Sequence, residues 1–417
     1  MAEDLKKAYR TVIHEHFPET LEISFGKGKD RQTLVYEKVL WEVEGEGKKG
    51  LRYGENPGQE AALYRPVTGN LVIGEARLVW PGEQLVTGAT LHQFGKHPGK
   101  INLTDADNAL NILRYLTEKP TCAIMKHNNP SGVAVADSLA EAYVRADLAD
   151  RVAAFGGCIA LNRPVDRTTA EEISQRYAEV VVAPGFEQGA IEILAKRKNL
   201  RIMEIKNMQR LQEWAPRHFL DFKSLIDGGL VAQVSFVPVT RKKEDLKHAA
   251  TEVNGKTYQV KRAPSEKEIQ DLLFGWMVEA GVSSNSVLYV KDLCTVGIGT
   301  GEQDRVGVAE IARDKAYRKL ADRLCFEHHK MPYNDLKNQD QKAEIDAEVQ
   351  RRKGGLPGAA MVSDAFFPFR DGVDVGLSEG VTAVIQPGGS VNDHQAIEAC
   401  NEHNATMVFT GQRSFKH

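Results

Sequence analysis

From about residue 103 onward, stretches with helical periodicity alternate with short apolar runs, and this alternation limits the possible fold more than any other feature. Helices that alternate with strands build a largely parallel or mixed sheet with helices on its faces. The sequence therefore predicts an α/β protein. The main expected helices are 105–116, 139–148, 168–177, 191–198, 266–280 and 306–324, and the main expected strands are 121–125, 153–161, 180–182, 200–205, 286–290 and 294–298.

Two charged stretches outside this pattern also predict helices. A short helix is expected from Asp4 to His16, because Pro18 would end it. The stretch from Lys337 to Lys353 is typical of a solvated surface helix.

The two halves of the chain carry the same order of signals. An Ala-Phe pair, a Val-Asp pair, an apolar run ending in Pro-Gly and an Ala-Ile-Glu sequence follow one another over residues 154–192 and again over residues 365–398. We interpret this echo as a duplicated α/β unit, with an active site where the units or their dimer mates meet. Chance similarity between two βαβ units is the alternative. The expected division is a short N-terminal segment (1–50), a first unit (51–235) and a second unit with the C-terminal tail (236–417).

Composition excludes several classes of function. The chain has 417 residues with 54 basic and 57 acidic side chains, a formal charge of -3, so no net basic field exists to gather nucleic acid. No apolar run is long enough to span a membrane, and no signal peptide opens the chain. The 5 cysteines are dispersed and lack a Cys-x-x-Cys motif, which favours reduced thiols. We therefore expect a cytoplasmic protein that binds neither nucleic acid nor membranes.

Lys126 and His127 form the first candidate catalytic pair. They follow the apolar run Thr121 to Met125, where the strand gives way to a polar loop. Ligands of α/β sheets usually bind at strand ends. A lysine can hold a phosphate or a developing oxyanion, and histidine is the side chain that exchanges protons most readily near neutral pH. The competing interpretation of the pair alone is two solvent-exposed polar side chains without a role in binding or catalysis.

Other polar loops offer further candidates. The octet from Arg52 to Gln59 is either a phosphate clamp or a structural turn, since the arginine fork matches phosphate oxygens. The glycines of Gly297 to Arg305 lack the full dinucleotide fingerprint and more plausibly let backbone approach a ligand, with Arg305 at the start of the next helix. The segment from Ser363 to Asp371 ends in Pro-Phe-Arg-Asp, whose charged residues need water, partners or a ligand. Zinc, serine-hydrolase and P-loop patterns are incomplete or absent.

Taken together, these segments closely resemble the AICAR transformylase family, the folate-dependent formyltransferase half of a bifunctional purine-synthesis enzyme. The resemblance runs in family order over roughly residues 50–417. It is carried by residues 51–59, 102–109, 126–132, 154–161, 180–185, 284–287, 297–305, 363–371, 386–390 and 409–417.

The resemblance implies a fold and a reaction. The fold would be two duplicated cytidine-deaminase-like αβα units without the zinc signature of true deaminases. The reaction would move a formyl group from 10-formyltetrahydrofolate to the 5-amino group of AICAR. His127 would be the general base and Lys126 would stabilise the oxyanion or assist proton transfer to the folate nitrogen. Asn285 and Asp371 would be polar partners near the formyl group.

The resemblance also assigns binding residues. Arg52 and Arg413 would hold the nucleotide phosphate, and Arg305, Phe369 and Asp371 would lie where the folate binds. The remaining nucleotide-binding positions would be Tyr53, Asn102, Phe155, Gly156, Glu179 and Phe415.

Partners follow from the resemblance as well. Family members are homodimers with shared active sites, and a bound potassium ion is known among them. Only about 50 residues precede Arg52, too few for the family's cyclohydrolase domain, so we expect a stand-alone transformylase that relies on a separate IMP cyclohydrolase. The alternatives are a non-catalytic AICAR or folate sensor on the same scaffold, and a zinc deaminase, against which the missing metal ligands argue.

Overall fold

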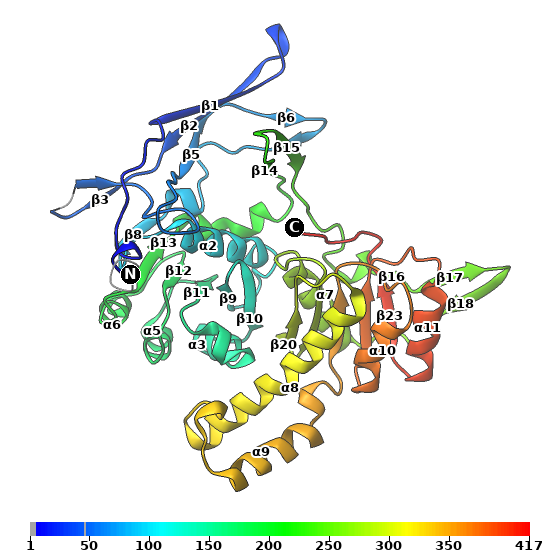
Figure 1. Ribbon diagram of the computed structural model, residues 1–417. Coiled ribbons are helices and arrows are strands. Elements are labelled where there is room, and N and C mark those ends of the chain that lie inside the picture. The colour runs from blue at the N-terminus through cyan, green and yellow to red at the C-terminus, as the bar shows by residue number, and fades with distance from the viewer. Residues whose placement is uncertain (1–5, 46) are drawn as a thin grey trace. The chain divides into compact units, whose positions relative to one another are not determined.

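The structure, a computed structural model, describes residues 6–45 and 47–417 (Figure 1). Packing divides the chain into two compact units, each assembled from two stretches of sequence. The first unit holds Met1–Leu110 and Gly156–Val237, and the second holds Asn111–Phe155 and Pro238–His417. This division reflects packing, whereas the boundaries expected at 50/51 and 235/236 follow the sequence echo and stay a prediction.

The second unit is built on a mixed sheet. Its strands lie in the order β16-β23-β22-β21-β19-β20-β10-β9. Strands β21, β22 and β23 run parallel to one another, and the hairpins β9–β10 and β19–β20 are antiparallel. The bounds are β9 Thr121–Lys126, β10 Asn129–Val135, β16 Lys247–His248, β19 Val287–Lys291, β20 Cys294–Gly299, β21 Ala360–Ser363, β22 Ala383–Gln386 and β23 Thr406–Phe409.

Helices of the second unit begin at recognisable caps. Ser265 and Glu268 form a reciprocal capping box at the start of α7, and Asp304 caps the long helix α8. Helices α8 and α9 lie side by side and share a small apolar cluster (Figure 1). The bounds are α3 Leu139–Ala149, α4 Arg151–Ala154, α7 Glu266–Glu279, α8 Arg305–His329, α9 Gln339–Arg351, α10 Asp371–Ser378 and α11 Asp393–Glu402, with η6 at Lys353–Gly355.

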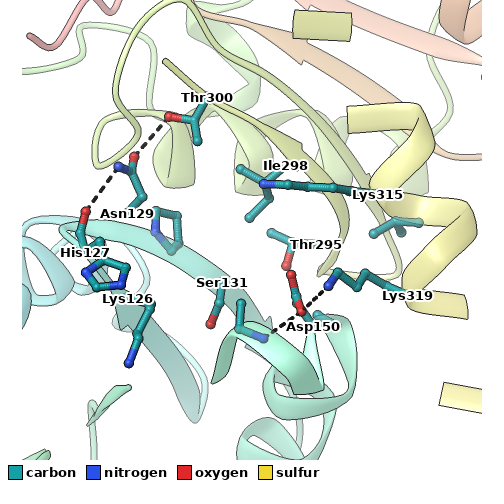
Figure 2. A pocket seen from close by; sticks show the side chains of 15 residues that line it. Lys126, His127, Asn129, Ser131, Asp150, Thr295, Ile298, Thr300, Lys315 and Lys319 are labelled. Atoms are coloured by element: carbon teal, nitrogen blue, oxygen red, sulfur yellow. Dashed lines mark hydrogen bonds and ion pairs between the residues drawn. The ribbon is translucent and has the colours of Figure 1, made fainter. Parts of the chain in front are cut away.

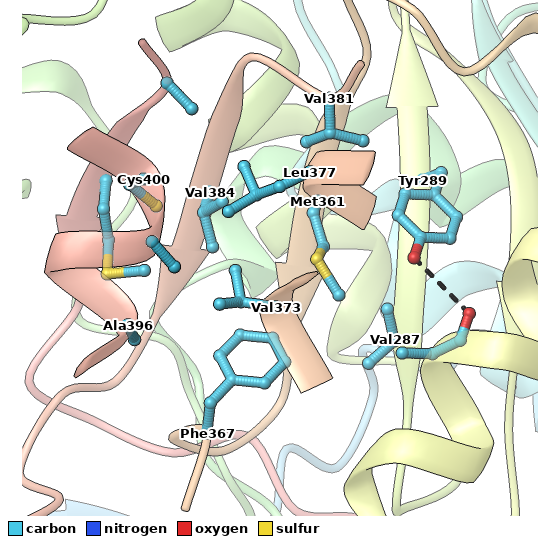
Figure 3. Close-up of a cluster of buried hydrophobic side chains, with 14 of the residues drawn as sticks. Val287, Tyr289, Met361, Phe367, Val373, Leu377, Val381, Val384, Ala396 and Cys400 are labelled. Atoms are coloured by element: carbon cyan, nitrogen blue, oxygen red, sulfur yellow. Dashed lines mark hydrogen bonds between the residues drawn. The ribbon is translucent and has the colours of Figure 1, made fainter. Parts of the chain in front are cut away.

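The core of the second unit lies between the sheet and its helices (Figure 3). Tyr289 and Phe367 are fully buried against aliphatic side chains from β21, β22 and α10. The Tyr289 hydroxyl donates a hydrogen bond to the Ala309 carbonyl, 3.4 Å away, which satisfies its polar end. Burial in this core fixes β19 against α8.

The first unit has a smaller sheet with strands in the order β11-β12-β13-β8. Strands β11, β12 and β13 are parallel, and β8 is antiparallel to β13. The sheet strands are β8 Thr90–Gln93, β11 Cys158–Leu161, β12 Val180–Ala183 and β13 Arg201–Glu204, with helices α2 Lys100–Leu113, α5 Arg167–Ser174 and α6 Ala190–Leu194. Outer strands are β1 Thr20–Phe25, β2 Gln32–Lys38, β3 Trp41–Val43, β4 Gly47–Lys49, β5 Tyr64–Thr68, β6 Val72–Ile73, β7 Ala76–Arg77, β14 Leu220–Ser224 and β15 Leu230–Val234.

The predicted α/β class is confirmed. One order of elements occurs twice along the chain. It consists of a helix, an antiparallel hairpin, a second helix and a parallel strand, followed by two further helix–strand steps. The first run extends from α2 to β13 and the second from α7 to β23. Among the described residues, no helix has the length and apolar character needed to cross a membrane.

Several local predictions were wrong. The expected strand 153–161 begins only at Cys158, because Asp150 caps the helical turn α4 and Gly156 then adopts a φ of 71°. The expected helix at 4–16 falls partly outside the described residues, and residues 11–18 contain no helix. The segment expected to be a solvated helix forms α9, but Ile345 and Val349 are buried against α8.

Candidate active site

The Lys126-His127 pair lies at the tip of the β9–β10 hairpin. Lys126 pairs with Asn129, so His127 and Asn128 alone form the turn. Both turn residues have positive φ, 54° and 60°, which is the geometry of the tight turn that matches the twist of hairpin strands. The expected polar loop is therefore a two-residue turn, and His127 is exposed at its tip.

Asn129 anchors this turn within the second unit. Its amide oxygen accepts hydrogen bonds from the Ser283 backbone N–H (2.9 Å) and from the Thr300 hydroxyl (3.1 Å). Its side-chain nitrogen donates to the His127 carbonyl at 3.4 Å. The Lys126 Nζ lies 3.4 Å from the Phe155 carbonyl. These contacts hold the hairpin tip at its β10 end and limit the positions that the His127 imidazole can reach.

A pocket of about 270 Å³ opens beside the hairpin tip (Figure 2). Lys126 and His127 line it from the hairpin, and Lys315 and Lys319 extend into it from α8. Asp150 is the carboxylate in its lining, and it binds Lys319 at 2.8 Å. Three lysines and one carboxylate therefore line the pocket, and this excess of basic side chains favours an anionic ligand.

Lys315 is the unusual cation of this pocket. Burial lowers its pKa, and the neighbouring charges of Lys319 and Arg318 act in the same direction while Asp150 opposes them. Sequence reasoning missed both Lys315 and Lys319. Their spacing of four residues on an expected helix placed them on one face, but nothing in the pattern related that face to His127.

In the first unit, two buried arginines meet at one carbonyl. Arg52 Nη1 donates to the Lys96 carbonyl at 3.1 Å, and Arg201 Nη2 donates to the same oxygen at 2.5 Å. Burial lowers the pKa of Arg201 to about 10. The positive charge of Arg52 also lowers this pKa, whereas the negative charge of Glu179 raises it. Among the described residues, neither Nε atom has a hydrogen-bond acceptor. Sequence reasoning missed Arg201, because a charged residue at the start of an apolar strand carries no special pattern.

Three expected nucleotide-binding residues lie around these arginines. Asn102 Nδ2 donates to Glu179 Oε2 at 3.3 Å, and that carboxylate lies 3.6 Å from Arg201 Nη1. The Arg52 guanidinium stacks over the Tyr53 ring, 4.5 Å from its centroid. The structure therefore brings Arg52, Tyr53, Asn102 and Glu179 into one cluster. Gly156 belongs to the same unit and donates its N–H to the Tyr177 carbonyl at 2.9 Å.

Arg305 and Asn285 belong to a buried polar cluster of the second unit. Arg305 forms an ion pair with the fully buried Asp364, and its Nη1 also donates to the Ser286 carbonyl at 2.9 Å. Its Nη2 donates to Asn285 Oδ1 at 2.9 Å, which fixes the orientation of that amide. The expected folate-site arginine thus already holds the backbone and side chains around Asn285.

Glu279 adds a second carboxyl group to this cluster. It is fully buried, and burial together with the charge of Asp364 raises its pKa well above the usual value, although the Ser286 hydroxyl and Arg305 oppose this. Within the part of the chain that the structure describes, three buried oxygens of the cluster lack a hydrogen-bond partner, and such atoms in a native fold commonly mark a bound ion or water. They are Glu279 Oε2, Asp364 Oδ2 and Ser414 Oγ.

The remaining expected residues lie at the surface of the second unit. Phe369 is 56% exposed, and Asp371 is exposed at the start of α10. The Arg413 guanidinium stacks on the Phe415 ring at 4.6 Å. This tail is tied down, because the Ser414 N–H donates to the Asp364 carbonyl and Ser284 exchanges hydrogen bonds with Lys416. No group of three metal-ligating side chains occurs among residues 6–45 and 47–417.

Comparison with protein families shows which family the sequence matches. Residues 4–315 match the model of a family described as the AICARFT/IMPCHase bienzyme. The chain belongs to this family.

Curated relatives of this AICARFT/IMPCHase family member are named bifunctional purine biosynthesis protein PurH. The protein of Magnetococcus marinus is 39% identical over 370 residues, 88% of this chain and 59% of the relative. That of Acetivibrio thermocellus is 34% identical over 406 residues, 97% of this chain and 62% of the relative. That of Acidithiobacillus ferrooxidans is 37% identical over 404 residues. The chain therefore spans about three fifths of the length of these relatives.

Proposed function

We propose that this chain transfers a formyl group from 10-formyltetrahydrofolate to the 5-amino group of AICAR, in purine biosynthesis. The observation that carries the proposal is the pair Lys126 and His127, held at the tip of a two-residue turn beside a lysine-lined pocket. Membership in the AICARFT/IMPCHase family supports it, as do relatives named for purine biosynthesis.

The chemistry needs a base and a positive charge at one place. The amino group of AICAR is a weak nucleophile because the carboxamide withdraws electrons from the ring. Attack forms a bond from the amine nitrogen to the formyl carbon, and His127 removes the amine proton. Lys126 stabilises the oxyanion that develops on the formyl oxygen. The bond to folate N10 then breaks, and N10 takes up the proton that His127 removed, with Lys126 assisting the transfer, which gives FAICAR and tetrahydrofolate.

The arginine pair of the first unit suits the nucleotide phosphate. Arg52 would bind phosphate oxygens, with Arg413 as a second contact. Arg201, which shares the Lys96 carbonyl with Arg52, would add positive charge. Asn102 and Glu179 offer hydrogen bonds to ribose or base. Tyr53, Phe155, Gly156 and Phe415 would complete the nucleotide site.

The folate side of the reaction draws on the second unit. Asn285, oriented by Arg305, would direct its amide toward the formyl group, and Asp371 would supply a second polar contact. Phe369 is an exposed ring of the size that packs on a pterin. Arg305 would act mainly by holding Asn285 in place.

The buried polar cluster fits a potassium ion. Among the described residues, its oxygens without a hydrogen-bond partner belong to Glu279, Asp364 and Ser414, and Arg305 forms an ion pair with one of the two carboxyl groups, that of Asp364. Hard oxygen donors of this kind are the ligands such cations prefer. When bound, the ion would offset the charge of the second carboxylate. Held in this way, Asp364 keeps Arg305 and Asn285 in place.

The direct test mixes the purified chain with AICAR and 10-formyltetrahydrofolate and follows the appearance of tetrahydrofolate by absorbance. Turnover that requires both substrates supports the proposal. Intact binding of both substrates without turnover would favour a non-catalytic sensor on the same scaffold.

Three further measurements test the remaining proposals. Chromatographic analysis of the products should find FAICAR without IMP, if a separate cyclohydrolase closes the ring. Sedimentation equilibrium should give a homodimer, and mixing inactive variants altered in Lys126 and in Arg52 should restore turnover if the active sites are shared. Formation of IMP, or failure of the mixed variants to complement, would contradict these proposals.

A further inference from the structure

The second hairpin of the second unit repeats the turn geometry of the candidate catalytic hairpin. Lys291 pairs with Cys294 across the β19–β20 turn, and the two turn residues, Asp292 and Leu293, have φ values of 54° and 56°. Strand β20 is antiparallel to β10, with Ala134 opposite Cys294. The two hairpin tips therefore point to opposite ends of the sheet, as in a pair related by twofold pseudo-symmetry.

A cavity of about 600 Å³ lies beside this second tip. It lies within the second unit, between α3, the β19–β20 turn, α8 and η6. Its volume falls in the range of small-molecule sites, about 300–1,000 Å³. Six cationic side chains line it: Arg145, Lys291, Lys319, Arg323, Arg351 and Arg352.

Carboxylates offset only part of this charge. Asp292, the carboxylate in the lining, forms an ion pair with Lys267 at 2.5 Å. Of the lining cations, Lys319 pairs with Asp150 and Arg323 pairs with Glu327. A single carboxylate, that of Glu348, contacts both of the arginines at 351 and 352.

Two lining cations contact backbone carbonyls instead of carboxylates. Arg145 Nη1 donates to the Val135 carbonyl at 2.7 Å and its Nη2 to the Asp292 carbonyl. Lys291 Nζ donates to the Pro357 carbonyl at 2.7 Å. Carbonyl dipoles orient these groups without neutralising them, so the cavity keeps an excess of positive charge among the described residues. An anion with several charges would complete it.

Part of the cavity lining is apolar. Leu148, Val296, Ala316 and Leu320 line it from α3, β20 and α8, and Pro357 adds a further apolar face. This combination of apolar and arginine side chains in the lining suits a ligand with an apolar body and clustered anionic oxygens. The planar arginine fork binds the oxygens of phosphate or carboxylate groups in pairs, and a di- or triphosphate carries several such oxygens close together.

We propose that this cavity is a second ligand site of the protein, which binds a small molecule carrying a di- or triphosphate group. The site is distinct from the formyl-transfer chemistry, because Asp292 occupies the turn position that His127 occupies in the first hairpin. The Asp292 carboxylate is paired with Lys267 and is a much weaker base near neutral pH than an imidazole, so this turn offers no general base suited to the transfer. Ala149, Thr295, Val296 and Lys319 line both cavities, so a ligand here would contact the wall of the candidate active site.

The test measures binding of inorganic triphosphate and of ATP to the full chain by titration calorimetry. Arg323→Gln and Arg352→Gln should each weaken binding by about tenfold, since each removes a charge-assisted hydrogen bond. Arg318→Gln is the matched control, an exposed arginine of the same helix that lines neither cavity, and it should leave affinity unchanged. Thermal melts of all three variants establish that they are folded.

A competition arm separates this cavity from the nucleotide site. Saturating AICAR should leave triphosphate binding intact, and tighter binding of ATP than of inorganic triphosphate would assign the apolar lining residues to a nucleoside. Equal binding of the two would assign the site to the phosphates alone and still support it. The proposal is overturned by absence of binding, by displacement with AICAR, or by equal losses in Arg318→Gln and Arg323→Gln.

Discussion

Lys126 and Lys291 occupy equivalent positions in two hairpins of one unit, each directly before a two-residue turn with positive φ angles. The residue that follows differs: His127 in the first hairpin and Asp292 in the second. Because both turns expose that residue, the difference decides which hairpin can accept a proton near neutral pH. The duplicated framework thus supports one candidate catalytic tip and one candidate binding tip.

Replacing His127 should abolish most turnover and leave nucleotide binding nearly unchanged. General base catalysis typically contributes about 10²–10⁴-fold, and kcat should fall by that order in both His127→Ala and His127→Asn. The asparagine variant matters because asparagine tolerates positive φ, whereas alanine strains the turn. Steady-state rates and AICAR calorimetry measure the two effects. Near-normal kcat in His127→Asn would remove His127 from the chemistry.

Replacing Lys315 by methionine should stabilise the fold. It should also lower turnover, because it removes a positive charge from the pocket that His127 lines. Burial lowers the pKa of Lys315, so the charged form costs free energy in the folded state. We expect Tm to rise by about 1–3 °C at neutral pH. The gain should disappear as the pH rises through the usual lysine value of 10.5, where the unfolded chain also loses the proton.

Lys337→Met, at an exposed position before α9, is the control for this effect and should leave Tm and kcat unchanged. A lower Tm in Lys315→Met would contradict the expected cost of the buried charge. Unchanged turnover would exclude Lys315 from the reaction.

The buried cluster should respond unequally to loss of Glu279 and of Arg305. Because burial raises the pKa of Glu279, glutamine resembles its protonated form, and Glu279→Gln should change the free energy of unfolding by less than about 1 kcal/mol. Arg305→Met would leave Asp364 buried without its partner and should cost about 3–5 kcal/mol. Urea unfolding in potassium-free buffer measures both. Equal losses would mean that Glu279 is ionised in the fold.

The capping box of α7 should contribute acid-sensitive stability. Partial burial raises the pKa of Glu268, but hydrogen bonds from Arg262 and Ser265 outweigh it and bring the value to about 2. The stabilisation is complete above the ordinary glutamate value of 4.5 and is lost as the pH falls toward 2. Glu268→Gln should therefore cost about 1 kcal/mol at neutral pH. The gap between the melting curves of wild type and variant should close in acid, and a constant gap would refute the linkage.

The sequence predicted the strands and helices best where one residue's neighbours decide its conformation. The apolar run ending at Met125 and the helical pattern after Asp304 are local signals, and the structure has β9 and α8 there. The segment at 153–161 failed because its apolar residues suit either a helical turn or a strand. The hydrogen bond from the Ala153 N–H to the Asp150 side chain stabilises the helical turn α4, and the positive φ of Gly156 then changes the direction of the chain.

The sequence by itself determined the α/β class, the repeated order of elements and the position of Lys126 and His127 at the end of a strand. Only the tertiary structure decided that Lys315 and Lys319 share their pocket, that Arg201 meets Arg52 at one carbonyl, and that a second hairpin carries a basic cavity. The physical reason is the separation along the sequence between the residues in contact. Periodicity and capping record contacts a few residues apart, whereas these clusters depend on strand pairing and helix packing between residues far apart in the chain.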